Sequence, residues 1–244
     1  MFQKYQNIFN QPTEQYNMQF YDQLVKQTNT DKQKFYSRKI ISSVLQEGVS
    51  KQLYLNYLTE AYNHVKYTCP LLEMSKNLMS LDKDKVFIDA FEEYIEEEKG
   101  HEEWILNDIK NIGGKPDGVR NSDGGIAVRA LISFMKYSIE KISPYSMLGM
   151  IYVLEGTSVN IAQEAAEAIA KKNNLNLNKG FSYLISHGKL DLSHVEFYKK
   201  LVNQVEDVNL QKIIIDTAKT VFLLWGNVFD EVADNYKINP RKAA

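Results

Sequence analysis

The chain has 244 residues, of which 44% are apolar and 25% charged, as is ordinary for a globular protein large enough to bury a substantial core. Its formal net charge of -2, with Lys and Arg scattered along the sequence, excludes the basic surface that nucleic acids and anionic lipids require. No segment has the apolar run of a secretory signal or a membrane span, and the single cysteine, Cys69, excludes an internal disulfide and a cysteine-based zinc site.

Apolar residues recur at helical spacing along nearly the whole chain, and no segment shows the alternation of a strand. This pattern predicts an all-α multi-helix bundle in a single domain, 1–244, in which residues 1–12 form a loosely held N-terminal extension. Pro70 is expected to kink the third helix, and Asp191 to cap the N-terminus of the eighth. The predicted helices cover residues 13–27, 31–47, 51–78, 82–112, 125–141, 144–172, 178–186, 191–205 and 208–236.

Glu155 interrupts the apolar stripe of the sixth predicted helix, with Ile151 and Val159 one turn away on either side. An unpaired buried carboxylate is strongly unfavourable, so this side chain needs a cation, a metal ion or a proton as its partner. A salt bridge to a Lys or Arg is the simpler explanation, and this helix alone does not exclude it.

Glu98 and His101 continue the apolar face of the fourth predicted helix and stand at positions i and i+3. This Glu-x-x-His spacing lets both side chains reach one metal ion and is found in di-iron carboxylate bundles, although it is also common by chance. Glu97 is the alternative carboxylate, within reach of His101 at i−4. Glu98 is favoured because its neighbours on the helix are apolar, whereas Glu97 adjoins Glu93.

A third cluster, His187, Asp191 and His194, has the spacing His-x3-Asp-x2-His. If Asp191 caps a helix, His194 lies three residues into that helix, and His187 can fold back across the turn expected at Gly188. Asp191 as an N-cap and His187 as a partner of the helix dipole would explain each of these residues separately. These roles do not explain why all three residues occur together. Imidazoles and carboxylates without a thiolate suit iron or manganese better than a structural zinc ion.

At these residues the chain resembles the haem-oxygenase-like di-metal oxidases and oxygenases, also described as iron-containing redox enzymes. The matching stretches are NHVKYTCPLL (63–72), EEEKGHEEWILNDIKNIGG (96–114), MLGMIYVLEGTS (147–158) and SHGKLDLSHVEFY (186–198). The resemblance implies a haem-oxygenase-like bundle of about seven core helices, with its metal-binding core over residues 50–235. It also implies two iron ions, with manganese as an alternative metal, and dioxygen as co-substrate. The implied metal ligands and catalytic residues are Glu98, His101, Glu155, His187, Asp191 and His194.

The family resemblance therefore implies an oxidoreductase that attacks a small organic substrate by desaturation, oxidative C–C cleavage or N-oxygenation. Two alternatives stay open: a metal-free enzyme on the same fold, like the TenA-type thiaminases and pyrroloquinoline quinone synthases, or a non-catalytic helical binding module. Residues expected beside the metals or in the substrate pocket are His64, Tyr94, Tyr152, Tyr198 and Glu73.

Each rival would need particular residues. A thiaminase needs a nucleophilic cysteine, and Cys69, among apolar neighbours, is expected to be a packing residue. Haem binding needs an axial histidine from an early helix, for which His64 is the candidate. A salt-bridge module needs cations opposite the carboxylates, and Lys136 and Lys219 are the nearest. We expect a cytoplasmic protein with a small-molecule substrate, no nucleic-acid or membrane partner, and a homodimer as the candidate assembly.

Overall fold

The computed structural model describes residues 18–238, except for the side chains at positions 160, 187–193 and 236–238. The described chain is helical and contains no strand, so the all-α prediction is confirmed. The expected N-terminal extension, 1–12, lies outside the described residues. The helices are α1 (Phe20–Tyr36), α2 (Lys39–Glu47), α3 (Lys51–Val65), α4 (Thr68–Asn77), α5 (Lys85–Glu98), α6 (His101–Asn111), α7 (Pro116–Arg120), α8 (Ile126–Tyr137), α9 (Ser146–Asn173), α10 (Ser182–Val202) and α11 (Val208–Ile238), with a short π-helix, Ser138–Ile142, after α8.

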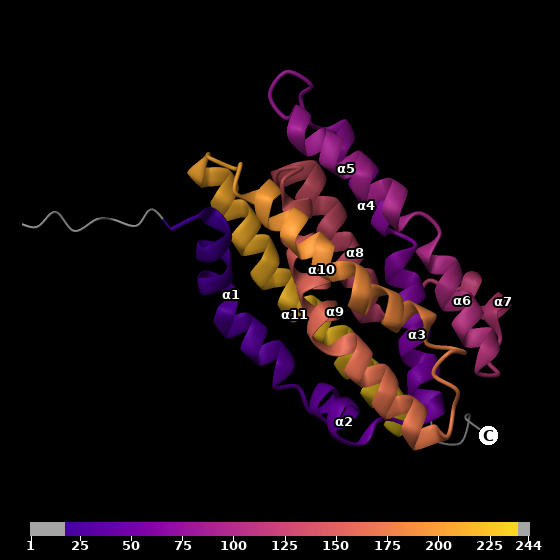
Figure 1. Ribbon diagram of the computed structural model, residues 1–244. Helices are drawn as coiled ribbons and strands as arrows, with labels where there is room; N and C mark the ends of the chain where they lie inside the picture. The colour runs from indigo at the N-terminus through magenta and orange to yellow at the C-terminus, as the bar shows by residue number, and fades with distance from the viewer. Residues whose placement is uncertain (1–17, 239–244) are drawn as a thin grey trace, which may run out of the picture.

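Three long helices form the centre of the bundle. Helices α10 and α11 both pack along α9, as Figure 1 shows, while α1 and α2 flank them on one side and α4 to α7 on the other. The last helix, α11, buries an apolar stripe formed by Ile214, Ala218, Val221, Trp225 and Val228. None of the described helices is both long and apolar enough to cross a membrane.

The first helix runs on past the break expected at residues 28–30 and ends at Tyr36. Thr28 is fully buried in its interior, where its hydroxyl donates to the Leu24 carbonyl oxygen at 2.7 Å. The chain turns instead at Ser37–Arg38. Arg38 reaches across to α11, where its guanidinium pairs with Asp230. It passes over Gly226 of α11, where a larger residue would collide with the Arg38 side chain. A long-range contact therefore sets the position of α2.

Two predicted helices are each divided in the structure. The helix predicted over 51–78 is two, α3 and α4, and Pro70 does not kink it but lies in the first turn of α4, where its missing N–H costs no helical hydrogen bond. The helix predicted over 82–112 breaks at Lys99–Gly100, where Gly100 adopts a left-handed conformation with φ +91°. A glycine takes this conformation without a steric penalty, so the chain can change direction here.

The prediction that Asp191 caps a separate helix is wrong, because α10 runs without interruption from Ser182 to Val202. An internal glycine such as Gly188 costs a helix only about 1 kcal/mol, which packing along α9 can offset. The N-terminus of α10 is capped from another helix. Asp108 of α6 is buried, and its carboxylate accepts hydrogen bonds from the Ser182 and Tyr183 backbone N–H groups at 3.0 and 2.9 Å and from the Ser182 hydroxyl at 2.8 Å.

This cap predicts a loss of stability in the Asp108→Ala variant. Removing the carboxylate leaves buried donors without acceptors, so the free energy of unfolding should fall by about 2–3 kcal/mol. Urea unfolding followed by circular dichroism measures this change. The exposed Asp82 gives the control, since Asp82→Ala should change stability by less than about 0.5 kcal/mol. Equal stability of the two variants would contradict the cap.

Candidate metal centre

Glu98 and His101 meet although they stand on different helices. Glu98 is the last residue of α5 and His101 the first of α6, and the turn at Gly100 brings His101 Nδ1 to 3.1 Å from Glu98 Oε2. Both side chains are buried, with 12% and 4% of their surface exposed. The ring of Trp104 lies against the imidazole at a tilt of 31°, with centroids 4.0 Å apart. The carboxylate and the indole together fix the orientation of the His101 ring.

His194 of α10 lies between two further carboxylates. Its Nε2 is 3.0 Å from Glu97 Oε2, and its Nδ1 is 3.8 Å from Glu155 Oε1 of α9. The side chains of His194 and Glu155 are buried, whereas Glu97 is 45% exposed. Glu97 and Glu98 thus contact different histidines, and neither takes the other's place.

His187 and Asp191 belong to α10, but their side chains lie outside the described part of the structure. Because the helix is continuous, His187, Asp191 and His194 stand at positions i, i+4 and i+7 of one helix rather than on either side of a turn. Among the side chains that are described, no three of His, Cys, Asp or Glu converge closely enough to hold one metal ion. The described part of the centre therefore consists of the pair Glu98–His101 and the cluster Glu97–His194–Glu155.

Of the three tyrosines that the sequence singled out, Tyr94 stands nearest to the centre. Its ring centroid is 6.1 Å from that of His194, and burial, followed by the charge of Glu155, raises the pKa of its phenol. The other two hydroxyls bond away from the centre. Tyr198 donates to the Leu148 carbonyl oxygen at 2.9 Å, and Tyr152 pairs with the Thr28 hydroxyl at 3.1 Å. Both are packing residues between helices.

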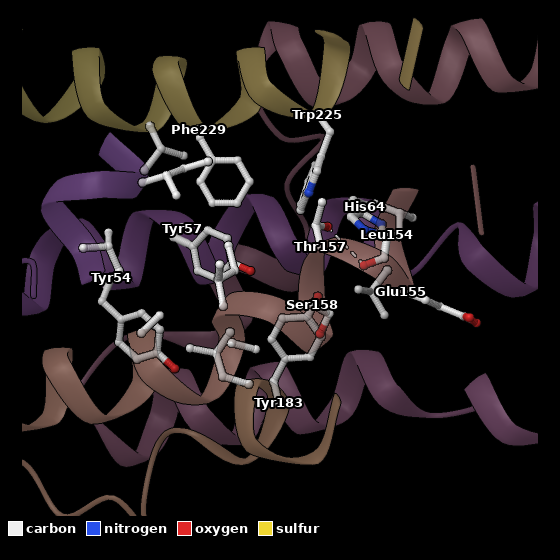
Figure 2. Close-up of a pocket in the computed structure, with 18 of the residues that line it drawn as sticks. Tyr54, Tyr57, His64, Leu154, Glu155, Thr157, Ser158, Tyr183, Trp225 and Phe229 are labelled. Carbon is white, nitrogen blue, oxygen red and sulfur yellow. Dashed lines mark hydrogen bonds between the residues drawn. The ribbon is translucent and has the colours of Figure 1, made fainter. Parts of the chain in front are cut away.

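The remaining two candidates differ in position. His64 of α3 is buried beside the centre and meets Trp225 edge to face, with centroids 4.9 Å apart (Figure 2). Glu73 of α4 is instead 45% exposed and forms a salt bridge with Lys76 at 3.1 Å. Glu73 is therefore a surface residue.

A cavity of about 150 Å³ opens beside Glu98, Glu155, Tyr94 and His64, and its wall is mostly apolar and aromatic. Figure 2 shows Glu155 at one end of the drawn lining and Tyr54 at the other. The sequence analysis did not identify this lining. Its aromatic residues sit at ordinary helical spacing, which is equally typical of core packing. They are Tyr54, Tyr57, Tyr183, Trp225 and Phe229.

Cys69 is half-buried at the start of α4, with its Sγ 3.8 Å from the Ile95 carbonyl oxygen. Burial raises the pKa of its thiol to about 11, and the charges of Glu98 and Glu102 act in the same direction. A thiol with this pKa is almost entirely protonated at neutral pH, and the thiolate is the nucleophilic form. Cys69 is therefore unsuited to act as a nucleophile.

The chemistry of the donor set fits iron. Buried carboxylates contact imidazoles at both halves of the centre, and these hard oxygen and borderline nitrogen donors are the ligands that non-haem iron and manganese accept. Of the cations named as rivals, Lys136 lies elsewhere. Lys136 is exposed and stands over the Tyr67 ring at 4.7 Å.

This fold and donor set define a class of helical proteins with a carboxylate–imidazole centre, and sequence comparison identifies the family. The chain belongs to the iron-containing redox enzyme family, whose family model matches residues 55–226. The resemblance stated from the sequence is thereby confirmed. A comparison with functionally curated proteins gives no match.

Solved structures share the fold. A domain of unknown function with a heme oxygenase-like fold from Shewanella denitrificans is 22% identical, with a TM-score of 0.82 over 92% of this chain and 96% of that one. A TenA homolog from Pseudomonas syringae is 12% identical (TM-score 0.76; 88% and 93% covered), and a heme oxygenase from Leptospira interrogans is 19% identical (TM-score 0.69; 88% and 100% covered). The predicted haem-oxygenase-like bundle is confirmed.

The raised pKa of Cys69 predicts slow alkylation. At pH 8 a thiol of pKa about 11 is ionised roughly a hundredfold less than a thiol at its ordinary value, so iodoacetamide should label Cys69 about a hundredfold more slowly than it labels free cysteine. Mass spectrometry of the intact chain over time measures the rate, and unfolded protein in urea serves as the control. Labelling of the native chain at the rate of free cysteine would favour a nucleophilic role.

Proposed function

We propose that the protein is an oxygen-dependent, non-haem di-iron oxidase or oxygenase that acts on a small organic substrate. The observation that carries this proposal is the position of two carboxylate–imidazole groups, Glu98–His101 and Glu97–His194–Glu155, beside an apolar cavity. Membership of the iron-containing redox enzyme family supports the identity of the metal.

In this proposal the metal ligands are Glu98, His101, Glu155, His187, Asp191 and His194, and Glu97 contributes a further carboxylate at His194. Iron, or manganese in its place, supplies the redox chemistry and binds dioxygen when it is present. Carboxylates offset the charge of the two cations, and imidazoles complete the ligand shell without adding negative charge.

The remaining residues prepare the site for this chemistry. The Trp104 ring and the Glu98 carboxylate hold the His101 ring in one orientation, so one nitrogen stays directed away from Glu98. Tyr94 keeps its proton at neutral pH because burial and the nearby Glu155 raise its pKa. Its phenol can therefore donate a hydrogen bond or a proton beside the reacting atoms, while the apolar wall excludes water.

Haem is a poor fit to this cavity, although several proteins of the same fold are heme oxygenases. A cavity of about 150 Å³ is the size of an engineered cavity that accommodates benzene, which is far smaller than a tetrapyrrole. His64, the candidate axial ligand, is packed edge to face against Trp225 inside this cavity. The non-haem proposal leaves His64 as a residue of the pocket wall.

The metal-free alternative rests on the TenA homologues among the structural neighbours. Its thiaminase form is disfavoured by the protonated thiol of Cys69. The binding-module alternative would expect Lys or Arg to neutralise the buried carboxylates. Histidines occupy that position at Glu98 and Glu155, and a histidine is a metal ligand when it is neutral.

The proposal predicts the metal content of the protein and its dependence on His194. Protein produced with ferrous iron and purified anaerobically should carry up to two iron ions per chain, measured by mass spectrometry of the metal. The His194→Ala variant should lose at least one of them, because it deletes a ligand between two carboxylates. Metal binding to the native state alone should also raise the melting temperature of the unmodified protein.

His64→Ala is the matched control, because both histidines are buried, at 4% and 6% exposure, and both variants remove an imidazole from the same region. Only the His194 variant should lose iron. Full iron occupancy in His194→Ala, or equal losses in the two variants, would refute the assignment of His194 as a ligand.

A further inference from the structure

The cavity beside the metal centre is long, and three helices define its direction. Along α9 its lining extends from Met147 to Ile169, and the part from Glu155 to Ile169 alone spans about four turns or 21 Å at 1.5 Å per residue. Along α3 it runs the opposite way, from His64 at the metal centre to Leu53 at the far end. Along α11, Trp225 contacts His64.

Contacts further along the same helices confirm this direction. Phe229, one turn beyond Trp225 on α11, packs against Tyr57 of α3 with centroids 5.5 Å apart. Val232, nearly one turn further, lines the far end. Helix α2 covers that end with four aliphatic residues at helical spacing: Ile40, Ile41, Val44 and Leu45.

The cavity is also narrow. Its volume of about 150 Å³ would be filled by a molecule of roughly benzene size if the space were round. Spread along some four helical turns, the same volume leaves room for a chain but not for a broad planar molecule. The cavity stays open along α9 because Ala162 and Ala165, which are both buried, present only methyl groups to it.

Several hydroxyl groups in the wall are engaged with the protein itself. Tyr54 donates to the Gly180 carbonyl oxygen at 2.9 Å, and Thr157 donates to the Leu154 carbonyl oxygen at 3.1 Å. The hydroxyl of Tyr57 is hydrogen-bonded to Tyr183. These groups are not available to a polar chain, so the wall favours an apolar occupant.

Charge is confined to one part of the cavity. The carboxylates of the lining are Glu98 and Glu155, which lie close together beside the proposed metal centre, and none of the described residues in the lining is Lys or Arg. A ligand with a permanent charge in its middle or at its far end would be buried there without a counter-ion, which is strongly unfavourable. A charged group of the ligand is accommodated best beside Glu98 and Glu155.

We propose that the substrate carries an unbranched alkyl chain, which lies along α9 between α3 and α11 and ends beneath α2, with its single polar group at Glu98 and Glu155. The placement of the polar group at the reacting centre rests on the proposed function. The placement of the chain rests on the shape and lining of the cavity alone. Ala162 and Ala165 set the length of chain that the site accepts.

The test uses the full-length protein, as purified with iron and after chelation, and a series of straight-chain primary alcohols as probes. Isothermal titration calorimetry should show that affinity rises about fourfold for each added methylene until the chain fills the cavity, and then stops rising. A branched or aromatic alcohol with the same number of carbons should bind at least tenfold more weakly than the straight chain. Absence of binding, or equal affinity for branched and straight chains, would overturn the proposal.

Two variants of α9 locate the site. Ala165→Phe places a ring in the far half of the cavity, so affinity should stop rising at a shorter chain than in the unmodified protein. Glu164→Phe adds the same ring on the exposed face of α9 and should leave the series unchanged. If Ala165→Phe does not fold, as judged by circular dichroism, Ala165→Val gives the same test with a smaller side chain. An unchanged series in the folded variant would refute this binding position.

The two forms of the protein separate this inference from the proposed function. Length-dependent binding in the chelated protein supports the alkyl site even if no iron is found. Stoichiometric iron with no length-dependent binding in either form would instead keep the metal centre and reject the alkyl substrate.

Discussion

Burial of carboxylates inside an apolar bundle is the constraint that organises this protein. Glu155 lies within α9, the helix that both α10 and α11 pack along, and its side chain is only 13% exposed. Desolvation of an ionised carboxylate must be offset by a partner at close range. His194 of α10 meets Glu155 on one side of its ring and Glu97 of α5 on the other. The hydrogen bond from Tyr198 to Leu148 fixes the register of α9 and α10 two turns along.

The ends of the helices position the side chains of the candidate site. A left-handed turn at Gly100 places His101 against Glu98. The i, i+3 spacing of these two residues would also have paired them in a continuous helix. Asp108, seven residues further along, caps the helix that carries His194. One segment, α5–α6, therefore carries the candidate ligands Glu98 and His101 and also caps the helix that carries His194.

The cavity and the carboxylate–imidazole groups beside it are two results of the same packing. Small side chains on α9 leave a space between α3 and α11, and the aromatic residues that border it keep their hydroxyls bonded to the protein. The proposed iron centre would stand beside a narrow, mostly apolar cavity, and a wall that keeps water from the reacting atoms would suit the oxidation of an apolar molecule. The family, the donor set and the cavity thus support one coherent activity.

The sequence by itself determined the helical class and the family, and it proposed the candidate ligands of the centre. The helical spacing of apolar residues does not depend on how the helices pack together. A charged residue within an apolar stripe, such as Glu155, can therefore be recognised from the sequence. Tertiary structure alone decided where several helices begin and end. Arg38 ends α1 by binding α11, and Asp108 starts α10 from another helix, although local sequence favoured Asp191 as its cap. The lining of the cavity was likewise hidden, because an aromatic residue that faces an empty space and one that fills a core have the same spacing in sequence.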